Sequence, residues 1–122
     1  MQDTLISIQD LLSQFIKNAP LLFILTGIAW GIHLLNTVLG RRLCLLGILP
    51  RRWFGLPGIV CSPWLHGNWG HLIMNSFMFL ILGSFMMIHG RPCFIIASIT
   101  IILLSGLLVW LFGRSSLHIG AS

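Results

Sequence analysis

Charged side chains are scarce in this sequence. Its 122 residues include seven lysines and arginines and two acidic residues, and only 7% of the chain is charged. An ordinary soluble domain carries about 25% charged residues, whereas 57% of this chain is hydrophobic and its mean hydropathy is +0.98. The composition therefore excludes an ordinary soluble domain. The net charge of +5 fits attraction to anionic lipid, and nothing indicates nucleic-acid binding.

Cysteine is also rare. The three cysteines, Cys44, Cys61 and Cys93, are scattered and form no C-x-x-C pair. An odd number at such spacing indicates free buried thiols rather than a disulfide framework or a cysteine metal site.

Long apolar runs dominate what is present. Residues 20–39, 71–88 and 94–112 each meet or approach the roughly 20 residues that a spanning helix needs. Residues 1–19 instead place apolar side chains at helical spacing, which predicts an amphipathic segment at the membrane surface. Together with the long first loop, residues 40–70, this pattern predicts an all-α polytopic membrane protein that forms one unit.

Small and polar residues within the spans predict helix contacts. Gly83, Gly106 and Ser105 are small enough to let helices approach closely. His33 and Asn36, in the first span, are expected to hydrogen-bond to a neighbouring helix.

A polar group stands at the start of the second span. His71 and Asn75 are four residues apart, so a helix places them on one face, and His66 lies just upstream. Polar groups inside a span are costly and are functional candidates by default. Imidazole and carboxamide N–H groups aimed at one point can hold an oxyanion, and such a site requires a nucleophile nearby.

The candidate nucleophile is Ser122, in the run Gly120-Ala121-Ser122. Small residues before a serine allow a sharp turn and a close approach. A serine at a helix start also presents its own backbone N–H toward the group that its oxygen attacks. Taken alone, the tripeptide is more often a helix N-cap.

The two motifs together resemble the rhomboid family of intramembrane serine proteases. That family carries His-x4-His-x3-Asn on its second span, which His66, His71 and Asn75 match, and Gly-x-Ser-Gly at the start of its fourth, which Gly120 to Ser122 match in part. The segment 47–66 also looks like the long first loop of bacterial members. The resemblance covers about residues 21–122.

The resemblance implies a rhomboid-like helical bundle over residues 20–122, with three spans and the start of a fourth, in a bacterial inner (plasma) membrane. It implies an endopeptidase that cleaves transmembrane segments of membrane proteins in the bilayer and needs no cofactor or metal. Ser122 would be the nucleophile, His71 and Asn75 would stabilise the oxyanion, and His66 and Gly120 would support them. The family takes its general base from a histidine on the sixth span, so the sequence reads as a truncated, inactive amino-terminal part.

Two arguments give opposite orientations of the chain in the membrane. The arginines of the first loop would place residues 40–70 in the cytoplasm by the positive-inside rule. The family implies the reverse, with this loop outside and the amino terminus in the cytoplasm. We expect the family orientation, because arginines that bond into the protein need not report topology.

Two alternatives remain open. One is a non-catalytic rhomboid-like membrane protein that binds transmembrane clients. The other is a haem or metal site built from His33, His66, His71 and His118. His66 and His71 are five apart, about 140° around a helix, which predicts that they cannot share an ion from one face.

Overall fold

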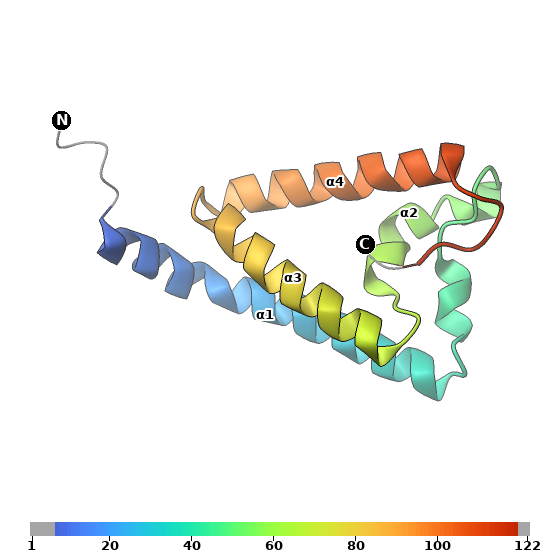
Figure 1. Ribbon diagram of the computed structural model, residues 1–122, viewed down its shortest axis with the longest axis horizontal. Helices are drawn as coiled ribbons and strands as arrows, with labels where there is room; N and C mark the ends of the chain where they lie inside the picture. Colours follow the sequence, from blue (N-terminus) through green and yellow to red (C-terminus); the bar gives the residue numbers. More distant parts are fainter. Residues whose placement is uncertain (1–6, 120–122) are drawn as a thin grey trace.

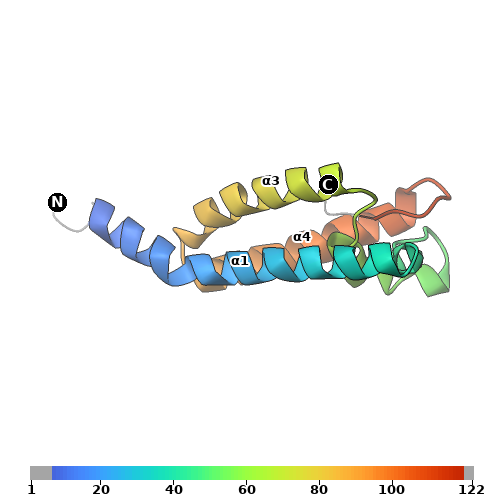
Figure 2. The same cartoon turned by 90° about the horizontal axis from the view of Figure 1, so that it is seen from below.

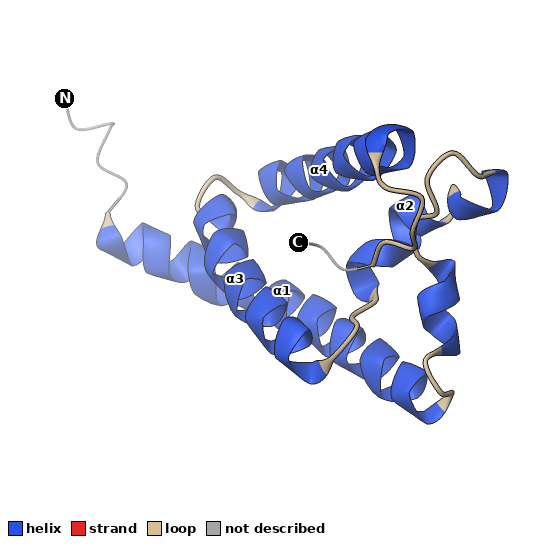
Figure 3. Cartoon of the chain, turned by 45° about the vertical axis from the view of Figure 1, so that its right-hand side comes forward, coloured by secondary structure: helices blue, strands red, loops and turns tan. Residues whose placement is uncertain are grey.

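The structure is a computed structural model, and it describes residues 7–119 (Figure 1). Helices joined by loops make up this part of the chain, and no strand occurs between residues 7 and 119 (Figure 3). The elements in order are α1 (Ile8–Val38), the short 3-10 helices η1 (Arg42–Leu46) and η2 (Trp53–Gly55), α2 (Gly58–Cys61), η3 (Ser62–Trp64), α3 (Trp69–Met87) and α4 (Arg91–Phe112).

Helices α1, α3 and α4 are each long and apolar enough to cross a membrane. They cover the three predicted spans except residues 39 and 88, and the predicted all-α polytopic membrane fold is confirmed. α3 begins at Trp69 because Asn68 caps it, and α4 begins at Arg91 because Gly90, at φ +97°, makes a turn that favours glycine.

The amino-terminal region differs from expectation. Residues 1–19 were predicted as a segment separate from the first span, but Ile8–Val38 is one helix of 31 residues. Ser7 starts it with a reciprocal capping box to Asp10. Pro20 lies inside the helix, where it removes a donor and causes the bend visible in Figure 2 without ending it.

The three long helices meet at one apolar contact. α1 and α3 run side by side, and α4 returns from the end of α3 (Figure 1). Leu22, Met87 and Phe94 are almost fully buried there. A Cβ at Gly83 would lie 2.7 Å from Leu22 Cδ2, so the predicted close approach at this glycine is confirmed.

The first loop packs against α4 (Figure 1). A Cβ at Gly106 would lie 2.5 Å from Ile59 Cγ2, so this glycine is also a contact point, whereas Ser105 is exposed and donates to a carbonyl of its own helix. Asn36 hydrogen-bonds to the short helix η1 that follows α1, not to another span. Its Oδ1 accepts from Leu43 N at 3.0 Å and its Nδ2 donates to Cys44 Sγ at 3.1 Å, which fixes the turn after α1. The three cysteines are free, as predicted. They were also expected to be buried, but two are half-buried and Cys93 is exposed.

Candidate functional site

The polar site is built at the start of α3. The Asn68 side chain accepts from His71 N at 2.8 Å, which satisfies one of the backbone donors that a helix start leaves free. The cap fixes where the helix begins. His71 therefore lies in the first turn and Asn75 one turn later on the same face.

Asn75 contacts two imidazoles. Its amide nitrogen lies 3.1 Å from His66 Nε2 and 3.2 Å from His71 Nε2. The two histidine rings stand edge to face with their centroids 5.3 Å apart. The structure thus joins His71 and Asn75, as their spacing predicts, and adds His66 to them. A carboxamide nitrogen carries two N–H groups, so it can donate to both imidazoles when their Nε2 atoms carry no proton.

The position of His66 corrects one prediction. His66 and His71 were expected to point to different faces of one helix, but His66 lies in the loop before α3 and its ring meets that of His71. The angle of about 140° around one helix therefore does not describe how His66 and His71 are placed. Across residues 7–119, no group of three or more His, Cys, Asp or Glu side chains is placed to hold a metal ion.

His66 is the buried member of the cluster. Its side chain is 3% exposed, whereas His71 and Asn75 are only half-buried. Burial, and after it the neighbouring His71, lower the pKa of His66 below its ordinary value. The imidazole is therefore neutral at pH 7. A neutral ring can accept the N–H of Asn75 at Nε2.

Aromatic residues of α1 support this end of α3. The His33 ring meets Trp69 edge-on, with centroids 4.4 Å apart, and the Trp30 ring lies 6.0 Å from the same indole. Trp30 Nε1 also donates to Ser76 Oγ at 2.9 Å. His33 was expected to hydrogen-bond to a neighbouring helix. It packs on one instead, and its buried Nδ1 has no hydrogen-bond partner within the described part of the chain.

The remaining candidates are Ser122, Gly120 and His118. Ser122 and Gly120 lie outside the described residues. His118 is apart from the histidine cluster: its Nε2 is 3.1 Å from the Arg114 carbonyl oxygen, and its backbone pairs with Ile48 through two bonds of 2.8 Å. The first loop therefore holds the segment that leads to Ser122.

Sequence reasoning missed two arginines that organise the loops. Arg41 donates to the carbonyl of Gly67, beside His66, and Arg51 binds the end of α4. Both have positive φ, which is uncommon outside glycine. Neither has a local sequence signal, because each partner lies more than twenty residues away.

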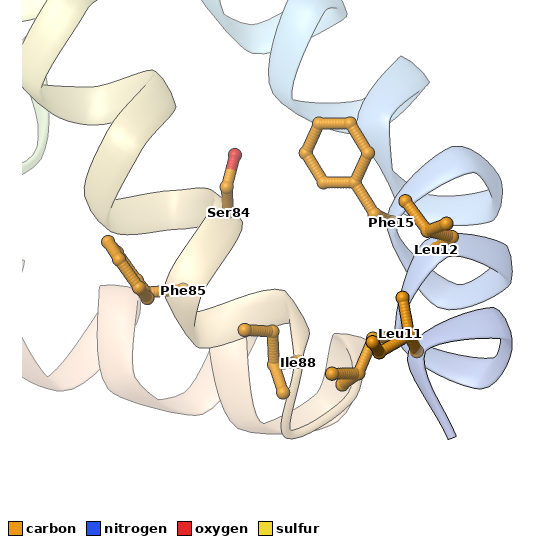
Figure 4. Close-up of a pocket in the computed structure, with 7 residues that line it drawn as sticks. Leu11, Leu12, Phe15, Ser84, Phe85 and Ile88 are labelled. Atoms are coloured by element: carbon orange, nitrogen blue, oxygen red, sulfur yellow. The ribbon is translucent and has the colours of Figure 1, made fainter. Parts of the chain in front are cut away.

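A hollow between the other ends of α1 and α3 has, among the described residues that line it, no polar group that could take part in catalysis. It has a volume of about 260 Å³ and is lined by apolar side chains apart from Ser84 (Figure 4). The Ser84 hydroxyl donates to the Leu80 carbonyl of its own helix. The hollow suits apolar chains and lies at the opposite end of α3 from the histidines.

Comparison with known proteins places this chain in a family. The family profile described as Rhomboid domain matches residues 52–122, which include the His66, His71 and Asn75 positions. No solved structure matches the chain.

The curated relatives are mycobacterial. Uncharacterized proteins of Mycobacterium tuberculosis and Mycobacterium bovis are each 40% identical to the chain over 97 residues, which is 75% of this chain and 40% of theirs. An uncharacterized protein of Mycobacterium leprae is 33% identical over 63 residues, 52% of this chain and 25% of its own. The chain thus spans well under half the length of these relatives.

Proposed function

Because the chain belongs to the rhomboid family, we propose that it forms part of an intramembrane serine endopeptidase that cleaves transmembrane segments of membrane proteins. The observation that carries this proposal is the convergence of His66, His71 and Asn75 at the start of a spanning helix. Polar side chains within a span are costly, so those that occur there are functional candidates.

In the proposed reaction, the Ser122 oxygen attacks the carbonyl carbon of a substrate peptide bond. The developing oxyanion is held by the Ser122 backbone N–H and by the side chains of His71 and Asn75. Each preorganised donor of this kind lowers the barrier by about 3 kcal/mol. The amide nitrogen of Asn75 contacts both imidazoles at rest, so the oxyanion would compete with these contacts for it. His66 then acts as the buried support that keeps the amide in place.

The general base is proposed to come from a histidine on the family's sixth span, beyond these 122 residues. A serine hydroxyl is a weak nucleophile without a base to take its proton. The relatives that the chain matches are about twice its length. We therefore assign the activity to the full-length gene product and expect the 122 residues alone to cleave nothing.

The proposed substrates are transmembrane proteins, and both the spanning helices and the family support this proposal. Three helices can cross a membrane, so the site at the start of α3 is reached from within or near the bilayer. Transmembrane proteins are the substrates that such a site would meet. The mycobacterial relatives fit the proposed bacterial plasma membrane.

The test uses the full-length protein in liposomes with a membrane-anchored model substrate. We expect cleavage within or beside the substrate's transmembrane segment, and none by the matched Ser122→Ala variant. Retention of the substrate without cleavage by the unaltered protein would refute the protease and support the client-binding alternative.

The proposed orientation, with the first loop outside, has its own test. Arg52 is exposed in that loop, so a cysteine at this position is accessible to a thiol reagent that cannot cross membranes. We expect Arg52→Cys to react in intact cells and Gln2→Cys to react only after permeabilisation. The opposite pattern would reverse the orientation.

A further inference from the structure

Arg51 joins the first loop to the end of α4, about sixty residues further along the chain. Its Nη1 donates to the carbonyl oxygens of Leu111 at 3.2 Å and Gly113 at 3.1 Å, and its Nη2 donates to Ser115 Oγ at 2.9 Å. Its backbone N–H donates to the Trp110 carbonyl at 3.0 Å. One residue therefore binds the last turn of the helix and the loop that follows it.

The chemistry of a guanidinium suits this position. The last four carbonyls of a helix lack partners within the helix and carry partial negative charge. A guanidinium offers five N–H groups in a fixed plane and stays charged. Arg51 has φ +56°, a conformation that costs free energy for a residue with a Cβ. Its four hydrogen bonds to the end of α4 and the loop after it offset that cost.

Residues just before Arg51 in the first loop hold the chain beyond Ser115. Ile48 and His118 exchange two backbone hydrogen bonds of 2.8 Å, as an isolated antiparallel pair. A Cβ at Gly47 would lie 2.5 Å from the His118 carbonyl oxygen, so the two backbones are in direct contact. The segment from Trp110 to His118 is thus tied to the first loop at both ends.

This tether reaches close to the proposed nucleophile. Ser122 follows His118 by four residues, and four extended residues span at most about 14 Å. Where the first loop holds His118 therefore limits where the Ser122 hydroxyl can be. A displacement of about 1 Å in a reacting group can cost about 100-fold in rate.

We propose that Arg51 is a positioning residue for Ser122: by binding the end of α4 and Ser115, it sets the path of the segment that brings the hydroxyl to His71 and Asn75. This inference rests on the proposed function. Arg51 acts through residues 111–118 and is not itself expected to touch substrate.

The experiment measures how fast a fluorophosphonate probe labels Ser122 in the full-length protein, together with the thermal midpoint of each variant. Arg51→Ala should lower the rate constant of labelling per folded molecule by at least about 10-fold. Arg51→Lys should recover part of the loss, because an ammonium keeps the charge but cannot bind three acceptors in one plane. With the model substrate, kcat should fall while KM stays the same.

Arg52→Ala is the matched control. Arg52 is exposed, and within residues 7–119 its side chain makes no hydrogen bond, although its backbone carbonyl accepts from Trp110 Nε1 at 3.0 Å. This variant should label at the rate of the unaltered protein.

Ser115→Ala is a second, milder variant that tests the same contact if Arg51→Ala fails to fold. It removes the acceptor of Nη2 and leaves the helix carbonyls bound, so labelling should slow by a few-fold at an unchanged thermal midpoint. Equal rate constants per folded molecule in the Arg51→Lys, Ser115→Ala and unaltered proteins would overturn the inference and leave the proposed function standing. Absence of labelling in the unaltered protein would instead overturn both.

Discussion

The start of α3 and the end of α4 are held in place by different means. At the start of α3, the side chains of His66, His71 and Asn75 contact one another, and α1 supports them from the side. At the end of α4, backbone groups carry the contacts and a single side chain from the first loop, Arg51, gathers them. The proposed oxyanion donors are thus fixed by helix packing, and the segment before the nucleophile is fixed by a loop.

That difference teaches how the two halves of the site respond to change. Packing between helices tolerates small shifts of flexible side chains, whereas a backbone held by direct contact has little freedom to adjust. Substitutions at the donors should therefore change the chemistry, and substitutions at the loop contacts should change the position of the segment before Ser122.

The largest effect is expected at Asn75. In the full-length protein, Asn75→Ala should lower turnover by about 10- to 1,000-fold, because an oxyanion donor is lost. Folding should remain largely intact, since Asn75 is only half-buried. Kinetics of model-substrate cleavage and thermal unfolding measure the two effects. A collapse of the thermal midpoint with unchanged activity per folded molecule would show that Asn75 is structural.

Alanine substitutions at Gly106 and Gly83 compare the contact between α4 and the first loop with the contact between α3 and α1. Gly106→Ala places a methyl 2.5 Å from Ile59 Cγ2 and 3.2 Å from its Cα, which cannot rotate away, and should destabilise the fold by about 3 kcal/mol. Gly83→Ala meets the terminal methyl of Leu22, which can turn, and should cost about 1 kcal/mol.

Gly27→Ala is the control for both glycine variants. A Cβ at Gly27 meets nothing within 4 Å, so the gain in helix propensity should stabilise the protein by up to about 1 kcal/mol. Unfolding in mild detergent ranks the three variants. A larger loss of stability in Gly83→Ala than in Gly106→Ala would contradict the claim that the loop contact adjusts less than the helix contact.

The smallest expected effect is at the hydrogen bond between Trp30 and Ser76. Ser76→Ala removes the acceptor of Trp30 Nε1 and should cost about 0.6 kcal/mol, the average for such bonds between helices in membranes. A double-mutant cycle with Trp30→Phe isolates this bond. A coupling near zero would assign the support of α3 to ring packing alone.

The sequence predicted the spans and the pairing of His71 with Asn75, because both follow from local periodicity. Hydropathy over about 20 residues marks a span, and a spacing of four marks one helix face. The continuity of α1 was missed because the amphipathic spacing of residues 1–19 was interpreted as a separate surface segment. A proline in a long apolar helix can bend it without ending it.

The positions of His66 and Arg51 could not be predicted in the same way. His66 meets Asn75 only because the loop before α3 turns back, and no periodicity describes a loop. Arg51 binds acceptors about sixty residues away that belong mostly to the backbone, so residue types carry no signal for it. Its bonds also give a physical reason for an arginine in this loop that is independent of membrane orientation.

The most direct test of the central claim is to map the adduct of a fluorophosphonate probe on the full-length protein by mass spectrometry. The account predicts one adduct on Ser122, absent from Ser122→Ala and formed much more slowly in Asn75→Ala. An adduct on another residue, or none under conditions where the protein is folded, would contradict the assignment of Ser122 as the nucleophile held beside His71 and Asn75.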